Sequence, residues 1–210
     1  MSLFRSVRIF FSFVKKKPSY IVSTLLMLIL LTASFNRNSI WQDDISLWTD
    51  VVEKSPYKAR GYNNLGNVYY HSGLIDKSID YYMKALKINS NFAEAHNNIG
   101  NAYLKKGMND KALEHLKAAI KLEPENAEIH YNLANVYYYS GNGLLAIEHY
   151  QFAVRLKPDF VDAYNNLGAV YEIKGLIDLA LEQYQTALRF NPESESARLN
   201  LNRILQKKTL

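Results

Sequence analysis

Asparagine side chains recur at a regular interval along this 210-residue chain, and each amide offers hydrogen-bond donors and an acceptor. One set repeats every 34 residues, and a second set follows it three residues later until Ala169 interrupts it. Helix propensity does not explain these residues, because asparagine is a mediocre helix former. Their amides suit either the backbone of an extended peptide or bridges between neighbouring helices and water. The residues predicted to bind a peptide are Asn64, Asn67, Asn98, Asn101, Asn132, Asn135 and Asn166.

The histidines follow the same interval, since His96 and His130 share one place in it and His115 and His149 share another. No two histidines lie four residues apart, the spacing that lets one helix hold a metal ion with two imidazoles. No Ser-His-Asp set, phosphate-binding loop or pair of acids stands out against the repeated pattern. The chain is therefore predicted to have no catalytic residue, metal site, cofactor or small-molecule substrate, and not to be an enzyme.

The interval also predicts the elements that position these side chains. Glycine and tyrosine recur at 34-residue steps, and so do several prolines. A repeat of this length indicates stacked units, each too small to bury its own apolar face. In the first unit Tyr62, Leu65, Gly66 and Tyr69 have the spacing of one helix face, and Gly73 ends that helix. A second helix is predicted to follow in each unit.

The second helices carry small residues opposite large ones, which lets antiparallel helices interlock. The pattern Y-x-x-L-G-x-x-Y…A-x-x-x-Y…P resembles the tetratricopeptide repeat over residues 59–194. The resemblance implies an all-α, right-handed solenoid with repeats at 59–92, 93–126, 127–160 and 161–194. Three first helices have glycine at their middle, namely Gly66, Gly100 and Gly168, which predicts that another helix passes too close for a Cβ atom.

Both ends of the array have predicted helices of their own. Residues 40–56 match the second helix of a preceding unit, because Trp48 and Val51 stand where Tyr82 and Ala85 stand in the first full repeat. The first helix of this half-repeat is missing. Residues 195–208 are predicted to form a capping helix with a polar outer side.

A stretch near the N-terminus is apolar enough to predict a membrane anchor. Residues 20–35 contain no charge, and residues 19–36 reach the lower limit of length for a transmembrane helix. Residues 1–18 are basic and are predicted to be a cytoplasmic or interfacial segment, with the repeats on the extracytoplasmic side in a periplasm or lumen. Two alternatives remain open, a cleaved signal peptide and a buried helix of a soluble protein.

Positive charge is concentrated in this N-terminal part of the chain. The formal net charge is +5, and residues 1–40 contain no acid and six basic residues, Arg5, Arg8, Lys15, Lys16, Lys17 and Arg37. The remaining residues are therefore close to neutral, which argues against a nucleic acid as partner. The chain has no cysteine, so it forms no disulfide.

The resemblance implies function as well as fold. In such solenoids the first helices line the concave side, and the asparagines resemble those of the O-linked N-acetylglucosamine transferase repeats, which hold peptide main chain. The predicted function is a membrane-anchored scaffold that binds a protein or peptide segment in its concave groove. Alternatively, residues 37–66 resemble the junction in O-mannosyltransferase-like membrane glycosyltransferases, where the last transmembrane helix leads into repeats. The chain would then be the non-catalytic C-terminal portion of such an enzyme.

Overall fold

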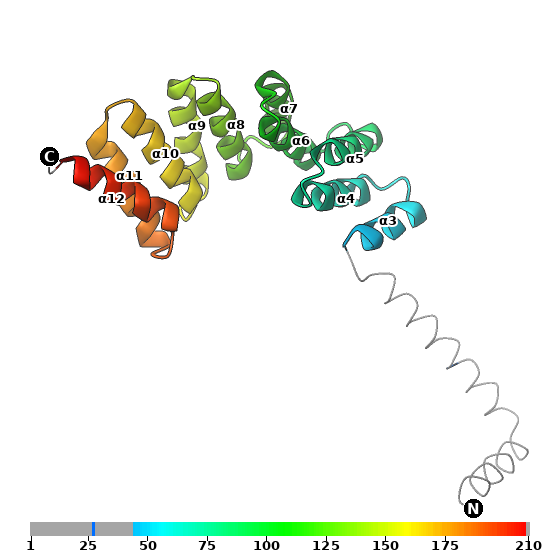
Figure 1. Cartoon of the computed structure of the whole chain (residues 1–210). Coiled ribbons are helices and arrows are strands. Elements are labelled where there is room, and N and C mark those ends of the chain that lie inside the picture. Colours follow the sequence, from blue (N-terminus) through cyan, green and yellow to red (C-terminus); the bar gives the residue numbers. More distant parts are fainter. Residues whose placement is uncertain (1–26, 28–43, 209–210) are drawn as a thin grey trace, which may run out of the picture. The chain divides into compact units, whose positions relative to one another are not determined.

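The computed structural model describes residue 27 and residues 44–208 (Figure 1). The part of the chain from 44 to 208 forms ten α-helices and no strand. They are α3 (Asp44–Lys54), α4 (Ala59–His71), α5 (Ile75–Ile88), α6 (Ala93–Lys105), α7 (Asn109–Leu122), α8 (Ala127–Tyr139), α9 (Gly143–Leu156), α10 (Val161–Ile173), α11 (Ile177–Phe190) and α12 (Glu195–Lys208). The prediction of an all-α fold is confirmed.

Each of the four expected repeats contains one pair of helices, the first of 13 residues and the second of 14. A glycine follows the first helix in every pair, with φ between +73° and +77° at Gly73, Gly107, Gly141 and Gly175. Only glycine adopts this left-handed conformation without strain. The residue after each glycine donates its backbone N–H to a carbonyl five residues earlier, as Leu74 does to Tyr69 at 2.9 Å. The turn therefore reverses the chain at the same point in each repeat.

The glycines at the middle of the first helices lie against large side chains of the second helices. A Cβ atom on Gly66 would come within 2.5 Å of the Tyr82 ring, and one on Gly168 within 2.7 Å of the Tyr184 ring. On Gly100 it would come within 2.5 Å of Leu116 Cγ. The predicted close approach is confirmed, and the atoms that fill the space belong mainly to side chains.

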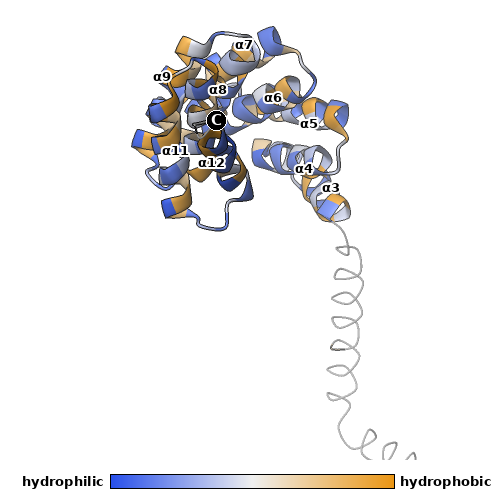
Figure 2. Cartoon of the chain, turned by 60° about the vertical axis from the view of Figure 1, so that its left-hand side comes forward, coloured by the Kyte–Doolittle hydropathy of each residue, from blue (hydrophilic) through white to orange (hydrophobic). Residues whose placement is uncertain are grey.

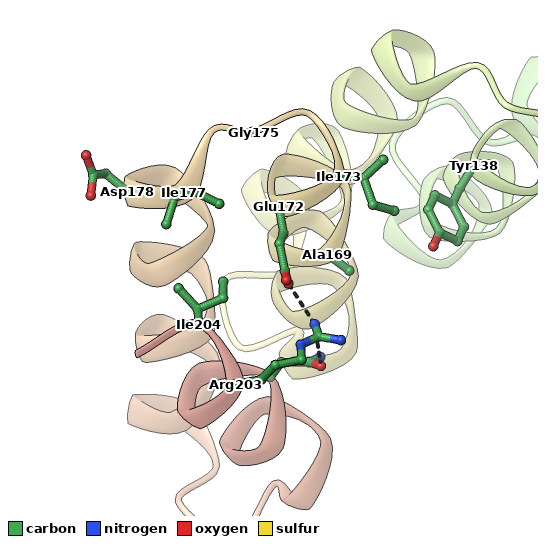
Figure 3. Close-up of a pocket in the computed structure, with 10 residues that line it drawn as sticks. Tyr138, Ala169, Glu172, Ile173, Gly175, Ile177, Asp178, Arg203 and Ile204 are labelled. Atoms are coloured by element: carbon green, nitrogen blue, oxygen red, sulfur yellow. Dashed lines mark hydrogen bonds and ion pairs between the residues drawn. The ribbon is translucent and has the colours of Figure 1, made fainter. Parts of the chain in front are cut away.

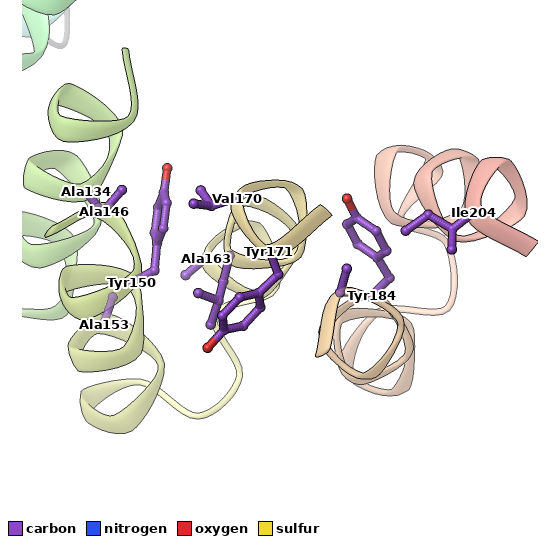
Figure 4. Packing of buried hydrophobic residues seen from close by; sticks show 11 residues of the cluster. Ala134, Ala146, Tyr150, Ala153, Ala163, Val170, Tyr171, Tyr184 and Ile204 are labelled. Carbon is purple, nitrogen blue, oxygen red and sulfur yellow. The ribbon is translucent and has the colours of Figure 1, made fainter. Parts of the chain in front are cut away.

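The core consists of clusters that continue from one helix pair to the next. Tyr82, Leu116, Tyr150 and Tyr184 occupy equivalent places in the second helices and are buried. Figure 4 shows Tyr150 directed toward Val170 and Tyr184 directed toward Ile204, within one cluster of buried residues. Burial raises the pKa of all three of these tyrosines, so they remain neutral in the folded protein. The tyrosines at these places serve packing.

Helix α12 caps the C-terminal end of the array. Ala197 and Ile204 are buried against the preceding helices, whereas Leu205 is 44% exposed. Hydrophilic and hydrophobic residues alternate along the helices, which is the pattern of elements with one buried side (Figure 2). Such a cap covers the apolar face that a last repeat leaves open.

The N-terminal predictions fall mostly outside the described residues. Helix α3 lies within the predicted half-repeat at 40–56. The predicted cytoplasmic segment at 1–18 and, apart from Met27, the predicted membrane segment at 19–36 are not among the residues described. None of the helices described has the length and apolar character needed to cross a membrane.

Candidate peptide-binding surface

The predicted asparagines all lie on the first helices of the repeats. Helices α4, α6 and α8 each carry two of them, and α10 carries Asn166. Asn132 is buried, with 6% of its surface exposed, and the other six are half-buried. None of these side chains extends fully into solvent, so the hydrogen bonds that each amide makes within the protein determine whether it is available to a ligand.

One set of amides links each repeat to the one before it. We call Asn64, Asn98, Asn132, Asn166 and Asn200 the amide row. The Nδ2 group of a row member donates to the residue 35 positions earlier, in four successive cases: Asn98 to Asn63 at 3.1 Å, Asn132 to Asn97 at 2.9 Å, Asn166 to the Tyr131 hydroxyl at 3.1 Å, and Asn200 to Asn165 at 2.9 Å. Bridging between neighbouring helices, one of the two alternatives for these amides, therefore occurs.

Asn200 was not predicted, although its signal was present in the sequence. It stands 34 residues after Asn166, but it belongs to the capping helix α12, outside the four full repeats. Its bond to Asn165 shows that the cap continues the inter-repeat contacts.

The second set of asparagines supports the row through its carbonyl oxygens. Asn67 Oδ1 accepts from the Tyr82 hydroxyl at 2.8 Å and from Asn98 Nδ2 at 3.0 Å. Asn135 Oδ1 likewise accepts from the Tyr150 hydroxyl and from Asn166 Nδ2. These phenols reach the amides from the core, so the polar surface and the buried tyrosines form one network.

Asn64 and Asn101 differ from the other predicted residues. Among the described residues, no hydrogen bond joins either side chain to another residue. Asn101 lacks a phenol partner because Leu116 stands where Tyr82 and Tyr150 stand in the neighbouring repeats. Their amides thus have donors and acceptors available for a ligand.

A pocket of about 740 Å³ lies near the C-terminal end of the array, lined by residues of α8, α10, α11 and α12 (Figure 3). Its apolar lining includes Tyr138, Ala169, Ile173, Ile177 and Ile204. Ile173 is 66% exposed, which is unusual for an isoleucine in a helix that packs on both neighbours. At position 169 the lining is apolar because alanine replaces the asparagine of the second set there.

Three charged residues, Glu172, Asp178 and Arg203, line this pocket, and Arg203 and Glu172 form an ion pair. Arg203 Nη2 lies 2.7 Å from Glu172 Oε2, and the Tyr184 hydroxyl donates to the same oxygen at 3.3 Å. Arg203 also donates to Asn200 Oδ1 at 3.2 Å, which connects the pocket to the amide row. The pocket was not predicted from the sequence, where its only signal was the interruption of the second set at Ala169.

The described residues include no cluster of three or more His, Cys, Asp or Glu side chains placed to hold a metal ion. The polar groups on this surface are amides, phenols, the ion pair of Arg203 with Glu172, and Asp178. Such groups recognise a ligand through hydrogen bonds and shape.

Replacing Asn132 with alanine is expected to lower the free energy of unfolding by about 1–3 kcal/mol, because it leaves the buried Asn97 Oδ1 without its donor. Asn64→Ala, at the equivalent place in the first repeat, should change it by less than about 0.5 kcal/mol. Urea unfolding of both variants checks this. Equal losses would show that the bridge between Asn132 and Asn97 adds nothing to stability.

Comparisons with known proteins agree with this arrangement. A family model described as TPR repeat matches residues 66–107 and 100–141, and one described as Tetratricopeptide repeat matches residues 131–195. No curated protein matches the chain. The crystal structure of MamA is similar over 71% of this chain and 87% of its own, with 30% identity and a TM-score of 0.63.

Two further solved structures are similar. YrrB, described as a TPR protein with an unusual peptide-binding site, is 26% identical over 77% of this chain and 84% of its own, with a TM-score of 0.62. TTC0263 from Thermus thermophilus, described as a thermophilic TPR protein, has a TM-score of 0.67 over 77% of this chain and 89% of its own. At 21% identity it supports the fold alone.

Proposed function

The chain belongs to the tetratricopeptide repeat family, and we propose that its array is a non-catalytic scaffold that binds an extended protein segment along the amide row. YrrB, a similar member of the family, is described by its peptide-binding site. In the present chain the corresponding ligand lies on the first helices, on the side expected to be concave. The amides provide hydrogen bonds to its main chain, and the C-terminal pocket receives one of its side chains.

The observation that carries this proposal is the continuity of the amide row with the pocket. The row runs through α4, α6, α8 and α10 to Asn200, which also lines the pocket. The bridges hold the last four row members, Asn98 to Asn200, in fixed positions, whereas the amides of Asn64, the first row member, and of Asn101 are available. A fixed polar surface loses little conformational entropy when a ligand binds.

The pocket indicates what kind of side chain the segment presents. Tyr138, Ile173 and Ile204 offer apolar surface, the charge of Glu172 is balanced by Arg203, and Asp178 also contributes to the lining. A large aliphatic or aromatic side chain gains most from such a lining, because it removes apolar surface of both partners from water. We therefore expect the bound segment to contain one apolar residue next to a stretch held by its backbone.

Site-specific photocrosslinking tests this function. Benzoylphenylalanine at Tyr138 should give discrete adducts with a protein partner, whereas the same probe at Leu144, which is 74% exposed on α9, should give none. Asn64→Ala combined with Asn101→Ala should weaken the Tyr138 adduct, since two lost hydrogen bonds of about 1 kcal/mol each correspond to about 30-fold in affinity.

The variant is chosen to leave the fold intact. Alanine at all row positions would also remove the inter-repeat bridges and mix binding with stability. Circular dichroism should show the Asn64→Ala/Asn101→Ala variant folded like the wild type. Adducts of equal strength at Tyr138 and Leu144, or adducts that the variant leaves unchanged, would contradict binding at this surface.

We further propose that residues 19–36 anchor the array to a membrane with the repeats on the extracytoplasmic side. The support is the uncharged stretch at 20–35 and the basic residues before it. Protease added to cells with a permeabilised outer layer should digest residues 41–210. Full protection of that part would contradict this topology.

The alternative, a C-terminal portion of an O-mannosyltransferase-like membrane enzyme, rests on the resemblance at residues 37–66. It predicts that the reading frame continues upstream of Met1 into further hydrophobic spans. A start site immediately before Met1 would favour the anchored scaffold.

A further inference from the structure

Two histidine pairs of the same geometry join the first and second helices of repeats 2 and 3. His96 Nδ1 on α6 lies 3.1 Å from His115 Nδ1 on α7, and His130 Nδ1 on α8 lies 3.0 Å from His149 Nδ1 on α9. The ring centroids are 5.3 Å apart in both pairs, at interplanar angles of 38° and 37°. The arrangement thus recurs in two successive repeats, and the proposed function makes no use of it.

A backbone carbonyl fixes the protonation of the first histidine in each pair. His96 Nε2 lies 3.2 Å from the Ser90 carbonyl oxygen, and His130 Nε2 lies 3.0 Å from the Pro124 carbonyl oxygen. A carbonyl oxygen only accepts, so Nε2 must carry the proton. When the ring is neutral its Nδ1 then accepts, and His115 or His149 donates the Nδ1–H between the rings.

This arrangement limits how many protons a pair holds. A first added proton can bind Nε2 of His115 or His149 and leaves the bond between the rings in place. A second must bind the accepting Nδ1 of His96 or His130. It removes the bond and places two positive rings with nitrogens about 3 Å apart, where like charges repel strongly.

The groups around the pairs offset this repulsion only in part. Glu114 beside His115 and Glu148 beside His149 favour the charged ring. The Tyr103 ring contacts His115 of the first pair, and the Lys111 ammonium lies over the Tyr103 ring. The Tyr137 ring contacts His149 of the second pair. Phe152 stacks on His130, and the Arg155 guanidinium lies over the Phe152 ring, which adds a further positive charge near the second pair.

We propose that the two histidine pairs are pH-sensitive contacts, here called latches, and that acid breaks them. One latch joins α6 to α7 and the other joins α8 to α9, where α6 and α8 carry members of the amide row. The Asn98 and Asn132 members of the row lie two residues after His96 and His130 on the same helices. Opening a latch therefore disturbs the row in the middle of the array. This effect on the ligand rests on the proposed function, whereas the latch itself does not.

The direction of the pH dependence follows from the second histidine of each pair. Burial, and then the neighbouring His96 or His130, lowers the pKa of His115 and of His149 below the ordinary 6.5. Between the lowered value and 6.5 the unfolded chain binds more protons than the folded one. Stability is therefore lost as the pH falls below about 6.5 and is retained above it.

The other repeats provide natural replacements for a test. Repeat 1 has Tyr62 and Tyr81 at the two places, and repeat 4 has Tyr164 and Gln183. His115→Tyr with His149→Gln thus introduces residues that the same fold already holds there. His71→Gln is the matched control, because His71 is exposed and belongs to neither pair.

The experiment is urea unfolding of the full chain in mild detergent at a series of pH values on both sides of the ordinary histidine pKa. In the wild type the unfolding equilibrium constant should rise below about pH 6.5, by about tenfold per pH unit for each proton taken up. His71→Gln should keep this slope, and the double variant should lose most of it. Equal slopes in the wild type and the double variant would overturn the latch.

NMR of the histidine rings in the wild type provides a second test that needs no variant. The paired rings should titrate in two separated steps, and the Asn98 and Asn132 side-chain amides should shift with the second. Rings that titrate independently near the ordinary histidine pKa would also overturn the proposal. If the latch is found but Asn64→Ala/Asn101→Ala leaves the Tyr138 adduct unchanged, the proposed function fails and the latch stands.

Discussion

Replacing Tyr150 with alanine is expected to lower the free energy of unfolding by about 3–5 kcal/mol, the range for removing a large aromatic ring from a core. The ring is 1% exposed and lies in the cluster with Ala134, Ala146 and Val170 (Figure 4). The change also removes the hydroxyl that donates to Asn135 Oδ1, which ties the core to the amide row. Urea unfolding at a pH above the range of the histidine pairs measures the loss.

Two further variants separate the ring from the hydroxyl. Tyr150→Phe keeps the ring and should lose only about 0.5–1.5 kcal/mol, because Asn135 Oδ1 still accepts from Asn166. Tyr139→Ala, where the side chain is 67% exposed, should lose less than about 1 kcal/mol. A loss at Tyr150→Ala no larger than at Tyr139→Ala would contradict the assignment of Tyr150 to the core.

Gly100→Val is expected to lower the free energy of unfolding by about 1–3 kcal/mol, because the added side chain overpacks the contact between α6 and α7. The first atom of the new side chain would lie 2.5 Å from Leu116 Cγ, so α6 and α7 have to move apart. Leu116→Ala alone should cost about 2–5 kcal/mol through the cavity that it leaves. The double variant should lose less than the two single losses together, because the valine fills part of that cavity.

A double-mutant cycle measures this relation. The coupling between the two positions should be about 0.5–3 kcal/mol, as for residues in direct contact. The third repeat shows that the site accepts a small increase in size, since Ala134 stands at the equivalent place and is buried beside Tyr150. Strict additivity of Gly100→Val and Leu116→Ala would contradict a direct contact between α6 and α7 at this point.

Both predictions depend on contacts between neighbouring helices, as expected for a repeat array. Each pair packs on the next pair, and the helices with the most extensive contacts belong to the same or to adjacent repeats. The effect of a substitution should therefore be strongest in its own repeat and the adjacent one. Hydrogen exchange of the same variants can follow where protection is lost.

The sequence alone determined the repeated unit, the two helices in it and the glycines between and within them. The 34-residue period identifies which residues are equivalent in successive repeats, and helix periodicity then predicts which face of a helix each of them occupies. Gly66, Gly100 and Gly168 predicted a close approach, and Gly73 predicted a helix end, because each depends on local geometry that only glycine meets. The membrane segment at 19–36 stays a prediction of the sequence.

Tertiary structure alone decided which of these equivalent side chains meet. The bridges of the amide row join residues 35 positions apart, and the latches join residues 19 positions apart. The bridges depend on how far each helix pair is rotated against the next, and the latches depend on how the two helices of one pair pack together. The period contains neither quantity. The bond of Asn200 to Asn165 and the pocket beside Arg203 likewise depend on how α12 packs against the preceding helices.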